Sequence, residues 1–356
     1  MMKKKINKIL FAMTTAVYIL GTAGCRNGET PDVSTTAVTA AASETEVSVH
    51  EEMPDVRQLA EVFVSKAETI YSCEQEINTD LDMDITVYGE TRNLSFTTRT
   101  LSQTTKEPFV MKATSSVDMA DEEGNPLSIT QEMYTEKTGD GLLTLYSQSG
   151  EDENAEWTKT VIEMPENTTD LLDVQLFKSI VEGKTEAVMS PETETAEGKE
   201  CFVVDTYLTV EETEEAMSNA ASILSQMGIP TDLYPEDMFK DLSVPTKVWI
   251  DVQTGLPVKT EQDLTEALNR IMEKLINTLI DNEAAAQALT DGTAQTEEAA
   301  DGDTAAESAA QTVPDVSMKI NRYSTEVIFR GYNEFEQIVI PENVRGAKTA
   351  DLYYAQ

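Results

Sequence analysis

Residues 246–261, TKVWIDVQTGLPVKTE, predict two antiparallel strands joined by a tight turn. The turn spans Asp251–Gly255, where Gly255 can adopt a positive φ angle at no steric cost because glycine has no Cβ atom. A hairpin of this kind is one unit of an antiparallel sheet. Further strands are therefore expected on both sides of it along the chain.

Strands are predicted upstream of this hairpin at short, regular spacing. In residues 79–87 apolar side chains alternate with polar ones, and Asp80, Asp82 and Asp84 share one face, which is the period of a strand with a solvated side. The other predicted strands are residues 94–103, 109–119, 127–135, 142–147, 157–163 and 201–210, and a closing strand covers 316–329. Turn-forming segments at 89–93, 121–126, 139–141 and 150–154 separate them, as in an antiparallel meander.

Helical spacing of apolar residues predicts helices at 55–73, from about Thr169 to Val181, at 211–227 and at 264–282. Residues 231–243 are predicted as a short helical or irregular connection. The apolar residues of segment 264–282 are spaced as in a strong amphipathic helix. Three roles remain open for it: it covers the apolar face of the sheet, it forms a movable lid over a ligand cavity, or it docks a partner.

The N-terminus predicts export and lipid attachment. Lysines within the first eight residues precede the uncharged segment 9–20, which is too short to span a bilayer, and small residues lead to Cys25. This pattern resembles the bacterial lipobox, with Thr22 in place of the usual leucine. We expect residues 1–24 to be a signal peptide cleaved before Cys25, which then carries the lipid that anchors the protein to the membrane. The alternative is an ordinary secretory peptide followed by a coincidental cysteine.

Two segments have the composition of disordered chain. Residues 25–53 are rich in Thr, Ser, Ala and Glu and predict a flexible tether, and the acidic, Ala-rich residues 283–313 predict a disordered insertion. The whole chain carries 65 acidic and 26 basic residues, for a formal net charge of -39. This charge disfavours binding to nucleic acid or to anionic headgroups through a broad basic face.

The order of these elements resembles the LolA/LppX-like lipoproteins. The residues that carry the resemblance are the hairpin signature WID…TGLPV within 249–258 and the tail signature GYNEFE…IVIP within 331–341. The resemblance implies an α+β fold, a curved, incomplete antiparallel β-barrel of about 10–11 strands with helices packed over its concave face. The domain would comprise residues 54–282 and 314–356. The tether is similar to those of Gram-positive surface lipoproteins, which implies a lipid-anchored position on the extracytoplasmic face of the cell membrane.

The residues of the domain specify no catalytic or cofactor site. The single histidine, His50, lies in the tether, and the chain has no phosphate-binding loop or zinc-protease motif. Asp80, Asp82 and Asp84 are spread along a strand, whereas calcium loops use tight turns to bring their oxygens together. We therefore expect no enzyme activity, no metal and no cofactor. Cys73 and Cys201 form an even pair that predicts either a disulfide or two buried thiols.

Two functions remain open. In the resembled family the pocket between sheet and helices receives acyl chains, so the first is a non-enzymatic carrier or sensor of a hydrophobic, lipid-like ligand. The second is an accessory subunit of a cell-envelope complex, in which the same apolar residues simply fill a core. The sequence specifies neither the ligand-binding residues nor a protein partner.

Overall fold

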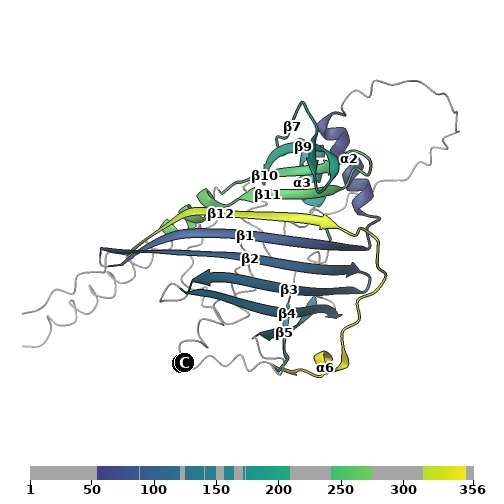
Figure 1. Cartoon of the computed structure of the whole chain (residues 1–356). Helices are drawn as coiled ribbons and strands as arrows, with labels where there is room; N and C mark the ends of the chain where they lie inside the picture. The colour runs from purple at the N-terminus through teal and green to yellow at the C-terminus, as the bar shows by residue number, and fades with distance from the viewer. Residues whose placement is uncertain are drawn as a thin grey trace, which may run out of the picture.

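The computed structural model describes residues 54–349, except for 88, 121–124, 140, 150–155, 164–170, 173, 209–241 and 275–315. Most of this part of the chain forms strands that pair into one curved, unclosed sheet (Figure 1). In chain order the strands are β1 (Ser72–Val87), β2 (Glu90–Lys106), β3 (Phe109–Ala120), β4 (Pro126–Gly139), β5 (Leu142–Ser149), β6 (Thr158–Glu163), β7 (Val188–Met189), β8 (Glu194–Ala196), β9 (Lys199–Leu208), β10 (Val244–Asp251), β11 (Pro257–Asp263), β12 (Val316–Arg330) and β13 (Lys348–Thr349).

Neighbouring strands follow the order β13-β6-β5-β4-β3-β2-β1-β12-β11-β10-β9-β7, and β8 pairs with β9. The pairing is antiparallel throughout these strands, apart from the parallel pair of β6 and β13. β1 lies beside β12, with Ile77 opposite Val327. The predicted α+β class with a curved, unclosed sheet is thus confirmed. The sheet has thirteen strands rather than 10–11 because β7, β8 and β13 are only two or three residues long, too short to show a period in sequence.

The helices are α2 (Val56–Ala67), α3 (Val174–Val181), α6 (Glu342–Arg345) and a helical segment at 265–274. At the start of α2 the Asp55 amide donates to Gln58 Oε1 at 3.4 Å. The helix predicted to reach Cys73 instead ends at Ala67, and Cys73 lies in β1. The apolar spacing of residues 68–73 fits both a helix and a strand. The pairing of Cys73 with Thr104 of β2 favours the strand. No helix of the described residues is long and apolar enough to cross a membrane.

Several predicted segments lie outside the described residues. They are the signal peptide, Cys25 and the tether, the helix at 211–227, most of the connection at 231–243, residues 275–282 and the insertion at 283–313.

The two faces of the sheet differ in what they bury. We call the face that packs against α2 and α3 the inner face, and the opposite face the outer face. In β1, Cys73, Ile77 and Leu81 belong to the inner-face cluster of buried residues. Because side chains alternate along a strand, the intervening glutamates and aspartates lie on the outer face. The alternation predicted over residues 79–87 therefore arises because successive side chains lie on the inner and the outer face in turn.

The tail after β12 returns to the outer face. Residues 331–347, which include α6, run from the end of β12 along the edge of the sheet in Figure 1. There Ile338, Ile340 and Val344 pack against outer-face residues of β3, β4 and β5, namely Val110, Tyr134 and Tyr146. Arg345 also donates to Glu136 of β4 at 3.0 Å. The predicted closing strand thus continues into a segment that covers part of the outer face.

Candidate ligand-binding face

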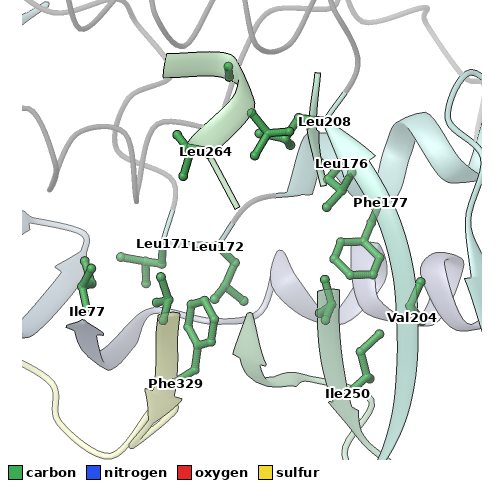
Figure 2. Close-up of a cluster of buried hydrophobic side chains, with 14 of the residues drawn as sticks. Ile77, Leu171, Leu172, Leu176, Phe177, Val204, Leu208, Ile250, Leu264 and Phe329 are labelled. Atoms are coloured by element: carbon green, nitrogen blue, oxygen red, sulfur yellow. The ribbon is translucent and has the colours of Figure 1, made fainter. Parts of the chain in front are cut away.

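One part of the inner face is filled by helices, and we call it the helix-covered region. It comprises inner-face residues of β1, β9, β10 and β12, with Phe96 of β2 and Val117 of β3, together with α2, α3 and residues 264–274 (Figure 2). The rings of Phe63 in α2 and Phe177 in α3 are in tilted contact, with centroids 4.1 Å apart and an angle of 46° between their planes. Figure 2 shows Leu176 and Phe177 among the strand residues Val204 and Ile250. The apolar side chains of this region therefore pack against one another.

The helical segment 265–274 is fixed to the sheet. Leu264, Ala267 and Ile271 are buried in the helix-covered region. Asn269 receives a hydrogen bond from the Ile320 amide and donates one to the Ile320 carbonyl, both at 2.8 Å. Of the three roles predicted for this segment, the described part fits the cover of the sheet's apolar face.

A second part of the inner face has no helical member among the residues that the structure describes, and we call it the strand-only region. Its buried cluster consists of residues from β3, β4, β5 and β6, namely Met111, Ala113, Met133, Leu143, Leu145 and Ile162. The register places all of them on the inner face, since Ala113 is opposite Met133 and Leu143 is opposite Ile162. Methionine side chains are flexible and polarisable, so they adapt to irregular apolar shapes. This cluster can follow the shape of an acyl chain.

A band of buried hydroxyl and amide side chains adjoins the strand-only region on the inner face of β1 to β4. Its members are Gln75, Thr79, Thr98, Thr100, Ser102, Thr104, Ser115, Gln131 and Thr135. Thr100 donates to Ser115 at 2.9 Å, and Gln75 donates to the Leu171 carbonyl at 3.1 Å. All nine side chains are uncharged. This hydroxyl band provides donors and acceptors beside an apolar cluster, which suits an amphipathic, uncharged segment of a ligand.

The sequence did not identify the hydroxyl band, although its signal is present. Residues 94–103 are dense in Thr and Ser, and the structure buries the even-numbered ones of β2. Both faces of β2 carry polar residues, so the alternation alone did not distinguish the buried face from the exposed one.

Cys73 and Cys201 are both free, buried thiols. Cys73 belongs to the inner-face cluster, whereas Cys201 lies with Trp249 and Val203 in a separate cluster on the outer face of β9 and β10. Because they point to opposite faces, the structure has the two-thiol alternative rather than the disulfide. Burial raises the pKa of Cys73 to about 12, which keeps the thiol protonated and unreactive at neutral pH.

The aspartates at 80, 82 and 84 lie along the outer face, as their alternation predicted. Asn93 Nδ2 donates to Asp82 and Asp84 at 2.9 and 3.0 Å, and Asn321 Nδ2 bridges the same two carboxylates. Arg322 pairs with Asp80 at 3.0 Å. Hydrogen bonds from Asn321 and then Asn93 lower the pKa of Asp84. No group of three acidic, His or Cys side chains suited to a metal ion occurs among the residues that the structure describes.

The comparisons with known proteins give structural likenesses alone, since no protein-family model and no curated protein sequence matches the chain. LprF from Mycobacterium bovis is similar at 9% identity, with a TM-score of 0.37, covering 81% of this chain and 97% of that one. A DUF1329 family protein from Desulfovibrio piger gives 11% identity, 78% and 92% coverage and a TM-score of 0.19. A domain from Vibrio parahaemolyticus gives 10% identity, 81% and 96% coverage and a TM-score of 0.18. The last is described as a "putative outer membrane lipoprotein-sorting protein domain".

Proposed function

We propose that the protein is a non-enzymatic, extracytoplasmic lipoprotein that binds a lipid-like ligand on the strand-only region. The ligand's acyl part would contact the methionine and leucine side chains of β3, β4 and β5, and its uncharged polar part would contact the hydroxyl band. The observation that carries the proposal is the contrast on one face of one sheet. Helices fill the helix-covered region, whereas within the described ranges the strand-only cluster contains residues of strands alone.

The anchor is the second element of the proposal. The lysine-rich start, the uncharged segment 9–20 and the small residues before Cys25 support lipid attachment at that cysteine. The tether at 25–53 would then hold the domain away from the extracytoplasmic face of the membrane. Loss of labelled palmitate from the Cys25→Ala variant, with full labelling of the unaltered chain, is the expected result. Equal labelling of both would overturn the anchor.

Lipid extraction from the purified full chain, followed by mass spectrometry, tests the ligand. β6 offers a matched pair of variants, because Ile162 is 3% exposed on the inner face and its neighbour Val161 is 52% exposed. We expect Ile162→Gln to lower the lipid recovered per protein and Val161→Gln to leave it unchanged. Thermal unfolding of both variants checks that each is folded.

The accessory-subunit function is the alternative outcome of the same experiment. The filled helix-covered region is the observation that favours it, because a core closed by its own side chains has no room for a ligand. A wild-type chain without lipid, together with a partner cross-linked in cells, would replace the first proposal by this one.

A further inference from the structure

A cationic cleft lies on the outer face, away from the proposed lipid site. It has a volume of about 400 Å³ and is lined by residues of β1, β2, β3 and the end of β12, among them Glu76, Arg99, Leu101, Lys112, Thr114 and Arg330. At its base, the Glu76 carboxylate accepts hydrogen bonds from Arg99 Nε and Arg330 Nη1, both at 2.9 Å. The Arg99 bond, together with that of Arg330, lowers the pKa of Glu76 although burial opposes it. Glu76 thus stays ionised and holds two guanidinium groups in place.

Several donors of this cleft have no acceptor among the described residues. Arg330 is held by two carboxylates, because its Nη2 also donates to Glu197 at 2.6 Å. Arg99 uses its Nε, whereas its two terminal nitrogens have no protein acceptor within the described ranges. Lys112 makes no ion pair with any residue that the structure places, and its ammonium group lies 5.9 Å from the centroid of the Tyr134 ring. In a chain with 65 acidic and 26 basic residues, a lysine without an acidic partner among the described residues, beside an arginine with unused terminal nitrogens, favours an anion from outside the chain.

The register brings these donors around one spot. Leu101 of β2 lies directly opposite Thr114 of β3. Arg99 precedes Leu101 by two residues and Lys112 precedes Thr114 by two, so the two cations flank the Leu101–Thr114 pair from opposite ends on the outer face. Long side chains from both ends can reach an anion above this pair, and the Thr114 hydroxyl adds a donor from below. Leu101 is 44% exposed and offers an apolar floor.

A second cavity on the same face has a different balance of charged residues. It has a volume of about 820 Å³ and is lined by five carboxylates and two cations. Both cations are paired within it, Arg322 with Asp80 at 3.0 Å and Lys247 with Asp205 at 3.8 Å. The cationic cleft is lined instead by three cations and two glutamates. The smaller cavity is therefore less negative than the larger one and is the more favourable of the two for an anion.

We propose that the cationic cleft binds a phosphate group, carried by a free solute or by a lipid headgroup. Donors that approach from opposite ends and from below suit the tetrahedral oxygens of phosphate better than the two coplanar oxygens of a carboxylate. The charged side chains of this cleft project from the outer face, opposite to the inner face that carries the proposed lipid site.

Calorimetric titration of the full chain in neutral detergent tests this site. The probes are inorganic phosphate and glycerophosphoglycerol, the water-soluble headgroup of an anionic phospholipid, with sodium chloride as the ionic control. We expect at least one probe to bind, and Lys112→Gln and Arg99→Gln each to weaken it about tenfold or more, because each removes a charge-assisted hydrogen bond. Arg322→Gln, which removes a paired cation from the larger cavity, should leave binding unchanged.

The outcomes separate the two sources of phosphate. Preference for inorganic phosphate assigns the cleft to a free solute, and preference for glycerophosphoglycerol assigns it to a headgroup. Absence of binding to both probes, or equal weakening by Arg322→Gln and Lys112→Gln, would overturn the proposal. Since Lys112 has no ion pair to lose among the described residues, its variant reports on binding rather than on folding.

Discussion

The helix-covered and strand-only regions belong to the same face of the same sheet, yet they bury their apolar side chains by different means. In the first, α2, α3 and residues 264–274 supply large side chains such as Phe63, Phe177 and Leu264. In the second, every member of the buried cluster comes from a strand. A sheet presents only one layer of side chains to each face, so a core needs a second layer. Among the described residues no helix supplies that layer over the strand-only cluster, and the proposed ligand would contact the cluster there.

The largest effect is expected in the helix-covered region. Phe63 is 1% exposed and its ring contacts that of Phe177, so Phe63→Ala should destabilise the protein by about 3–5 kcal/mol. Chemical denaturation measures the free energy of unfolding. Val62→Ala, at a 44% exposed position of the same helix, serves as control and should change it by about 0.5 kcal/mol or less. Similar values for the two variants would break the distinction between a packed core and the remaining surface.

A variant of the strand-only region is expected to differ from Phe63→Ala in how much added lipid stabilises it. Leu145→Ala should cost about 2 kcal/mol in lipid-free protein, and it should also reduce the stabilisation gained on adding the extracted lipid. Phe63→Ala should leave that gain intact, because its side chain packs against α3 in the helix-covered region. Thermal unfolding with and without lipid measures both. An equal loss of lipid stabilisation in the two variants would contradict a ligand confined to the strand-only region.

Ion pairs of Glu76 on the outer face of β1 are expected to stabilise the same strand whose inner face packs in the helix-covered region. The lowered pKa of Glu76 means that its ionised form stabilises the fold above its unfolded pKa, about 4.3, and that this contribution is lost as pH falls through the folded value. Glu76→Gln should therefore destabilise by about 2 kcal/mol at pH 7 and by less below pH of about 4. Glu74→Gln, on the same strand face, is the control. A pH-independent difference between Glu76→Gln and wild type would exclude the charge effect.

The smallest effect concerns the contact between α2 and the hairpin. Gly255 has a φ of +67°, and a Cβ there would meet Val62 Cγ1 at 3.0 Å. Gly198 has a φ of +75° with nothing within 4 Å. Both Gly→Ala variants are strained, and Gly255→Ala should cost about 1 kcal/mol more because it also disturbs the helix. Equal losses in urea unfolding would show that α2 yields to the added methyl group.

The sequence predicted the long strands well because their hydrophobic period and their turns agree. The 246–261 hairpin and the alternation at 79–87 are found as β10–β11 and the first strand. The candidate site was harder, because it depends on which strands become neighbours. Met111, Met133 and Leu145 come together only through strand pairing, and the hydroxyl band looks in sequence like an ordinary polar surface. Arg99 and Glu76 likewise meet across β1 and β2.

The pairing of β1 with β12 has a consequence for when the protein can fold. Residues 72–87 have their final neighbour at 316–330, so one side of β1 stays open until nearly the whole chain is available. Contacts between residues so distant in sequence form slowly, because the entropy of closing a long loop is lost before the contacts contribute any stabilising free energy. If the chain crosses the membrane N-terminus first, as the segment before Cys25 predicts, the sheet is completed only after passage. The order of strands would thus delay folding until export is over.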